Sequence, residues 1–171
     1  MEEHFNLDEL FQIAIKLEQN GAVFYREAMN CAVEPVQRDL LAELAMAAEG
    51  YAAALSDIRE EIGQDSRRDS VYEGRDSSAD YLWAWAGHVV FNADADPFNL
   101  VAADACLGEI LEVAIRRKKE SIVFYEGLLR GCEKPEHRQR VERFLTGEML
   151  HLANLSEQSL RVRELMSSNS G

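Results

Sequence analysis

Hydrophobic side chains recur along most of this chain at alternating spacings of three and four residues. That spacing is typical of amphipathic helices that bury a single stripe, because 3.6 residues complete one helical turn. The pattern predicts four long helices, over residues 7–30, 35–62, 107–130 and 135–165. Ala, Leu and Glu are abundant and only three prolines occur, which also favours helices. We therefore expect an all-α protein.

Residues 63–106 separate the second and third predicted helices and form a connection long enough to traverse a helical bundle. The first half of this connection is polar, charged and rich in serine, which is typical of an exposed segment. Residues 79–91, ADYLWAWAGHVVF, are rich in aromatic side chains and predict a short helix. These aromatic side chains should pack across their own bundle or form the interface of a homodimer, where aromatic residues are enriched.

The chain repeats itself at an offset of 100 residues, with no gap within the aligned helices. The matching positions are Ala14, Ile15, Val23, Phe24, Tyr25, Pro35, Arg38, Leu55 and Ser56, which recur as Ala114, Ile115, Val123, Phe124, Tyr125, Pro135, Arg138, Leu155 and Ser156. Two helical hairpins of one design explain this repeat, and their short turns make each helix pair antiparallel. The predicted fold is one domain over residues 1–171, a four-helix bundle of two pseudo-twofold-related hairpins joined by one long crossover.

Charge and composition narrow the possible functions. The chain of 171 residues carries 18 Lys and Arg against 31 Asp and Glu, a net charge of −13. This balance argues against binding to nucleic acids or anionic membranes, because both need a basic face. The longest mostly apolar stretch, residues 81–91, is too short to span a bilayer, and the first residues lack an apolar signal segment. The chain has three cysteines and no CxxC pair, so the sequence indicates neither a thiolate metal site nor a disulfide framework. We therefore expect a cytoplasmic protein.

The four apolar stripes meet in a middle layer that is polar. Glu18 lies in the stripe of the first helix, Lys118 in that of the third, and Glu148 and His151 in that of the fourth. Because Glu148 and His151 are three residues apart, both side chains leave their helix in the same direction. A carboxylate and an imidazole that project into a bundle core form half of a site for a metal ion. Glu18, Glu148 and His151 are therefore the candidate metal ligands.

The sequences AIKLEQNGAVFY, around Glu18, and AIRRKKESIVFY, around Lys118, resemble the paired first and third helices of the rubrerythrin branch of the ferritin-like superfamily. EMLH, residues 148–151, resembles the second Glu-x-x-His motif of that family. The resemblance covers the four helices and not the crossover. It implies a ferritin-like bundle whose di-iron carboxylate centre reacts with peroxide or dioxygen. The implied ligands are one Glu from each of the first and third helices and one Glu-x-x-His from each of the second and fourth.

The ligand pattern that this resemblance implies is incomplete in this chain. Glu18, Glu148 and His151 match it, but the third helix carries Lys118 where the family has Glu. By the repeat offset, the second-helix pair falls on Ala48 and Tyr51. Many rubrerythrins have a further Glu three residues after the third-helix ligand, and that position is Ser121 in this chain. A shift of one residue would make Glu49 the second-helix ligand, with Ala52 in place of His, but it would break the apolar repeat. The chain also lacks a rubredoxin-like CxxC segment that could deliver electrons.

The charges of the middle layer indicate whether a metal site can form despite these missing ligands. Glu18 and Glu148 carry two negative charges, and Lys118 with a protonated His151 would balance them without any metal. A buried ammonium group also repels a nearby divalent cation. Because a buried ammonium needs a carboxylate, Lys118 should lie within salt-bridge distance of Glu148, Glu18 or both, in a largely dehydrated layer. Three interpretations stay open: a buried ion-pair layer, one iron or zinc ion held by Glu18, Glu148 and His151, or a complete dimetal centre with ligands from elsewhere. Tyr25, Tyr51 and Tyr125 are predicted to pack in the core with hydroxyls that can reach the layer.

Two functions follow as hypotheses. The first is a rubrerythrin-like bundle with a degenerate dimetal site, which acts in binding, structure or regulation, has no catalytic residues and holds no cofactor or a single metal ion. The second is an iron-dependent oxidoreductase, of the peroxidase or ferroxidase type, in peroxide or oxygen defence. The combination of Ala48, Tyr51 and Lys118 favours the first, because it removes ligands and adds a cation.

Overall fold

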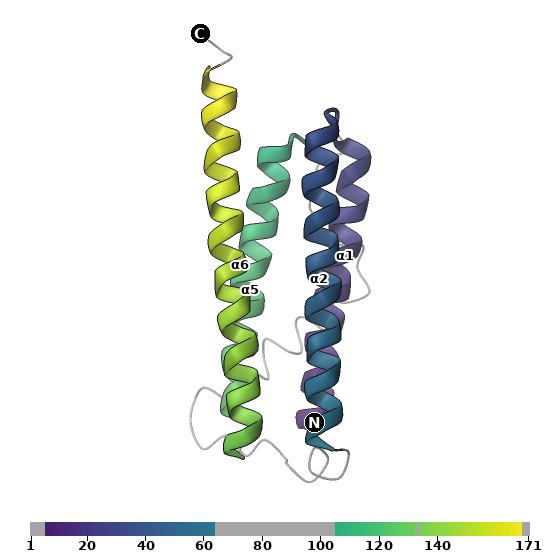
Figure 1. Cartoon of the computed structure of the whole chain (residues 1–171), viewed down its shortest axis with the longest axis vertical. Coiled ribbons are helices and arrows are strands. Elements are labelled where there is room, and N and C mark those ends of the chain that lie inside the picture. Colours follow the sequence, from purple (N-terminus) through teal and green to yellow (C-terminus); the bar gives the residue numbers. More distant parts are fainter. Residues whose placement is uncertain (1–5, 64–104, 133, 169–171) are drawn as a thin grey trace, which may run out of the picture.

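The computed structural model describes residues 6–63, 105–132 and 134–168. These residues form α1 (Leu7–Ala28), a 3-10 turn (Met29–Cys31), α2 (Pro35–Ile62), α5 (Leu107–Arg130) and α6 (Pro135–Ser168). The described part of the chain contains four α-helices and no strand, and the helices run side by side as a four-helix bundle (Figure 1). The prediction of an all-α, four-helix protein is confirmed. The predicted short helix over residues 79–91 lies outside the described residues.

The ends of the helices follow local sequence signals. At the start of α1, the side chain of Asn6 accepts a hydrogen bond from the Glu9 amide, and the Glu9 carboxylate accepts one from the Asn6 amide. Such a capping box satisfies amide groups that have no partner inside the helix. Pro35 opens α2, where its missing amide hydrogen costs nothing. The observed bounds lie within three residues of the predicted ones: the first helix ends as a 3-10 turn, and the last runs on to Ser168.

Two apolar clusters fill the bundle, one toward each end. One cluster joins the start of α1, the end of α2, the end of α5 and the start of α6, with Phe11, Leu55, Leu128 and Val141 fully buried in it. The other cluster joins the opposite ends of the same helices. Neighbouring helices α1 and α5, and likewise α2 and α6, therefore run in opposite directions. The polar layer lies between the two clusters, in the middle of the bundle.

We predict that Leu55→Ala destabilises the fold by about 2–5 kcal/mol, because Leu55 is fully buried and its removal leaves a cavity. The matched control is Leu160→Ala on α6, where the side chain is 58% exposed and the expected change is within about 0.5 kcal/mol. Urea unfolding followed by circular dichroism measures both. Equal losses of stability in the two variants would contradict the packing described here.

Candidate functional site

All four helices contribute to the polar layer. Glu18 comes from α1, Tyr51 from α2, Lys118 from α5, and Glu148 with His151 from α6. Glu148 is fully buried, and Glu18, Lys118 and His151 are each less than 9% exposed. Burial of four ionisable side chains is costly unless they are paired, so the layer depends on how its charges meet.

Lys118 binds both carboxylates of the layer. Its Nζ atom donates hydrogen bonds to both oxygens of Glu18, at 3.0 and 3.1 Å, and to Oε2 of Glu148, at 2.6 Å. Hydrogen bonds between ionised groups are shorter and stronger than neutral ones, and an ammonium group has three donors to give. The sequence prediction that a dehydrated Lys118 would lie within salt-bridge distance of Glu18, Glu148 or both is confirmed.

Two tyrosines complete the surroundings of this ion-pair network. The hydroxyl of Tyr125 donates a hydrogen bond of 2.5 Å to Oε1 of Glu18. The ring of Tyr51 lies 5.2 Å from Nζ of Lys118, within reach of a cation–π attraction. The same ring stacks on His151, with centroids 5.4 Å apart and 25° between the planes. The expectation that tyrosine hydroxyls reach the layer holds for Tyr125. The Tyr51 hydroxyl donates instead to the carbonyl of Gly147, and its stacking on His151 was not expected from the sequence.

The protonation of the layer differs from the charge balance expected from the sequence, in which a protonated His151 and Lys118 neutralise the two carboxylates. Burial raises the pKa of Glu148 to about 7, and the negative charge of Glu18 adds to this effect while Lys118 opposes it. Burial and the charge of Lys118 lower the pKa of His151 to about 4, so its imidazole is neutral at pH 7. Burial also acts to lower the pKa of Lys118, but the carboxylates of Glu18 and Glu148 outweigh it and the pKa rises. A proton that enters the layer near neutral pH therefore binds Glu148 more readily than His151.

The residues of this layer do not fit a dimetal centre. The ammonium of Lys118 occupies the space between the two carboxylates and repels divalent cations. From α2, Ala48 is buried and the ring of Tyr51 lies against Lys118, and neither side chain supplies a carboxylate or an imidazole. Within the described ranges, no group of three or more His, Cys, Asp or Glu residues is arranged to hold a metal ion.

The alternative register, with Glu49 as a ligand, does not agree with the geometry either. Glu49 lies on the outside of α2 and forms an ion pair with Arg26 of α1. Ala48 is buried in its place, as the repeat offset predicts.

Three buried polar atoms of the layer have no hydrogen-bond partner among the described residues: Oε1 of Glu148 and both ring nitrogens of His151. Because Oε2 of Glu148 binds Lys118, this carboxyl group is used on one side only. A neutral imidazole offers one donor and one acceptor. Glu148 and His151 thus retain some capacity for hydrogen bonding or for one ligand, whereas Glu18 is fully engaged by Lys118 and Tyr125.

Comparisons of the chain with protein families, with curated proteins and with solved structures find no significant match. In the described part of the chain, no helix combines the length and the apolar character needed to cross a membrane.

We predict that Lys118→Ala destabilises the protein by about 3–5 kcal/mol, because it leaves two buried carboxylates without their cation. Lys119→Ala is the matched control, since Lys119 is the next residue of α5 and is exposed. Thermal melts of both variants at pH 7 provide the comparison. If the two variants melt at the same temperature, the ion pairs of Lys118 do not stabilise the fold.

The shifted pKa values predict two opposing effects of pH. His151 binds a proton near pH 4 when folded and near 6.5 when unfolded, so its contribution to stability grows as pH rises between these values. Glu148 loses its proton near pH 7 when folded and near 4.5 when unfolded, so its contribution falls as pH rises between them. Each slope is at most about 1.4 kcal/mol per pH unit.

Replacing each group separately should reveal these slopes. Relative to wild type, His151→Gln should lose stability as pH rises from 4.5 to 6.5, and Glu148→Gln should gain stability over the same range. Urea denaturation at a series of pH values measures both differences. Slopes of the same sign in the two variants would contradict the opposite shifts of the two pKa values.

Proposed function

We propose that this chain is a ferritin-like bundle of the rubrerythrin type whose dimetal site has been replaced by an ion-pair layer, and that it acts as a binding, structural or regulatory protein without redox catalysis. The observation that carries this proposal is the position of Lys118, whose Nζ lies 3.0 Å from Glu18 and 2.6 Å from Glu148. A cation that is part of the chain thus takes the position between carboxylates that a metal would need.

The arrangement of the layer supports descent from a symmetric metal site. Glu18 and Lys118 are 100 residues apart, which is the offset of the sequence repeat, and they meet in one layer. Ala48 and Tyr51 precede Glu148 and His151 by the same offset and face the layer from the facing helix. These relations favour two hairpins related by a pseudo-twofold axis and joined by the long crossover.

A second candidate function rests on Glu148 and His151. Because one oxygen of Glu148 and both nitrogens of His151 lack partners among the described residues, a single iron or zinc ion could use them, with Glu18 as the third ligand. An iron-dependent oxidoreductase in peroxide or oxygen defence would need such an ion. Lys118 must then leave its present position, because it already engages both oxygens of Glu18.

The remaining expectations concern partners and location. Association of two copies through the aromatic residues 81–91 stays a prediction, because those residues lie outside the described part of the chain. The net charge of −13 supports the absence of nucleic acid and anionic membrane among the partners. A cytoplasmic location is likewise part of the proposal.

We predict that the protein holds fewer than two iron equivalents per chain after loading with ferrous iron. The physical reason is that Lys118 supplies a fixed positive charge where the dimetal site needs a carboxylate. Elemental analysis of protein purified without chelators measures the metal content. Two tightly bound irons with the absorption of an oxo bridge would overturn the proposed function.

The variant Lys118→Glu sharpens this test, because it restores the carboxylate of the family and removes the cation. It should be less stable than wild type without metal and should gain stability when ferrous iron or zinc is added, since a ligand of the folded state shifts unfolding by mass action. Lys119→Glu on the exposed side of α5 is the matched control and should not gain. If wild type gains as much from metal as Lys118→Glu, the layer is a working metal site.

A further inference from the structure

Near the middle of their length, α2 and α6 expose uncharged side chains to the outside of the bundle. On α6, Leu150 is 64% exposed, and on α2 the side chain of Met46 is 63% exposed. Gly50 lies beside Met46 on α2, and a Cβ atom added to it would meet nothing within 4 Å. Leu150 protrudes from one helix and Gly50 leaves space on the neighbouring helix, so this face of one molecule could fit the same face of another.

Helices α2 and α6 are neighbours and present this surface together, in front of α1 and α5 (Figure 1). The Tyr51 hydroxyl of α2 donates a hydrogen bond to the carbonyl of Gly147 of α6, and Arg140 at the start of α6 pairs with Glu61 at the end of α2. The two helices therefore run antiparallel in direct contact. The α2/α6 face is defined here by Asp39, Met46, Gly50 and Asp57 of α2 and Arg143, Leu150 and Arg161 of α6.

The charges on this face occur at matching distances from its centre. Arg143 lies seven residues before Leu150, and Asp57 lies seven residues after Gly50, about 10 Å along each helix. Arg161 lies eleven residues after Leu150, and Asp39 lies eleven residues before Gly50, about 16 Å along each helix. Spacings of seven and eleven residues are close to whole numbers of turns, so each set stays on one side of its helix.

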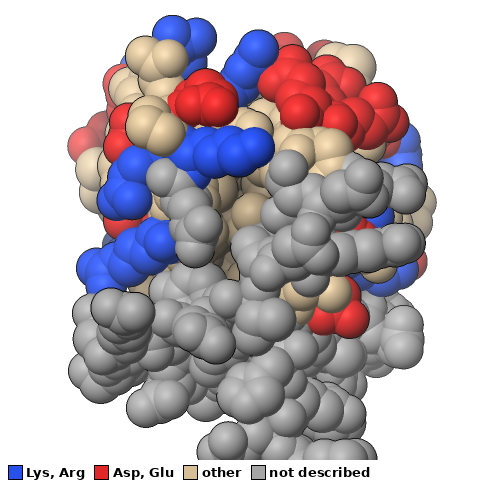
Figure 2. Space-filling view, turned by 90° about the horizontal axis from the view of Figure 1, so that it is seen from below, with Lys and Arg blue, Asp and Glu red and all other residues tan. Residues whose placement is uncertain are grey.

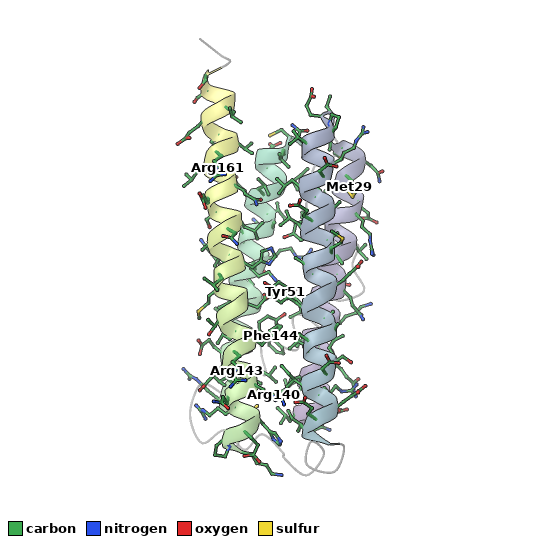
Figure 3. All side chains as sticks on the ribbon, in the orientation of Figure 1. Met29, Tyr51, Arg140, Arg143, Phe144 and Arg161 are labelled. Carbon is green, nitrogen blue, oxygen red and sulfur yellow. The ribbon has the colours of Figure 1, made fainter. Side chains whose placement is uncertain are left out.

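These charges are available for an external partner. Arg143, Asp39 and Asp57 are exposed, and none of them forms an ion pair with a described residue. Arg161 pairs with Glu157 of its own helix, where both side chains are at least 61% exposed. Arg143 and Arg161 lie on α6 on either side of its middle (Figure 3). Seen from one end of the bundle, Lys and Arg gather mainly on one side and Asp and Glu on the other (Figure 2).

We propose that a second copy of this chain docks on the α2/α6 face, with α6 of each copy against α2 of the other. A two-fold axis parallel to the helices keeps the direction of every helix, so α6 meets the other α2 antiparallel. With Leu150 opposite Gly50 of the other copy, Arg143 lies opposite Asp57 and Arg161 opposite Asp39. Each contact occurs twice, as an isologous interface requires. Glu157, which lies opposite Glu43, keeps Arg161 as its counter-charge.

Sedimentation equilibrium of the full chain tests this interface. We expect wild type to be a dimer and Leu150→Arg to weaken association by about tenfold or more, because a charge then lies in the centre of the contact. Met149→Arg is the matched control, since Met149 is 46% exposed but points about 100° away around α6. Both substitutions are on the surface, and circular dichroism verifies that the variants fold.

Charge reversal tests the register of the contact. Arg143→Asp and Asp57→Arg should each weaken association, and the double variant should restore it, because the pair is re-formed with its signs exchanged. Failure of the double variant to recover would overturn the proposed register.

Two results would overturn the proposal as a whole. One is a wild type that stays monomeric over the whole concentration range. The other is a dimer that Leu150→Arg leaves intact and the combined Trp83→Ala and Trp85→Ala change dissociates, which would place the contact in the aromatic segment. Neither result bears on the metal content of the protein, so the proposed function is tested independently.

Discussion

The interaction on which the rest of this structure depends is the contact of the Lys118 ammonium group with the carboxylates of Glu18 and Glu148. It joins three helices, α1, α5 and α6, in the middle of the core, at a point where apolar packing is interrupted. A rotation of α5 by one residue would turn Lys118 by about 100° and leave two carboxylates buried without a cation. The ion pairs therefore oppose any other alignment of the helices, while the apolar clusters at both ends supply most of the stabilisation.

The same contact governs the chemistry of the neighbouring side chains. Burial lowers the pKa of His151, and the positive charge of Lys118 lowers it further, so the imidazole that stacks on Tyr51 stays neutral at pH 7. Glu18 receives hydrogen bonds from Lys118 and Tyr125. The counter-charge of the two carboxyl groups is thus part of the chain itself.

Helix α2 has an unusual role in this arrangement, because small side chains line its middle on both sides. Ala48 and Ala52 face the interior near the polar layer, and Gly50 lies exposed on the outer side at the same level. Inside the bundle, the side chains of Ala48 and Ala52 make no polar contact, so the polar contacts of the layer come from the other three helices and from Tyr51. On the outside, they let a second helix approach closely, as the proposed contact with Leu150 of another copy requires.

The sequence by itself determined the four helices, the inward stripes and the members of the polar layer, because helical periodicity assigns each residue to a face without reference to distant residues. It also determined that Lys118 meets a carboxylate, since a buried ammonium group needs one. Only the tertiary structure decided that Lys118 binds both carboxylates, that Tyr125 donates to Glu18 and that Tyr51 stacks on His151. It likewise decided that the pKa of Glu148 rises and that of His151 falls, because pKa values depend on burial and on distances between helices that periodicity does not specify.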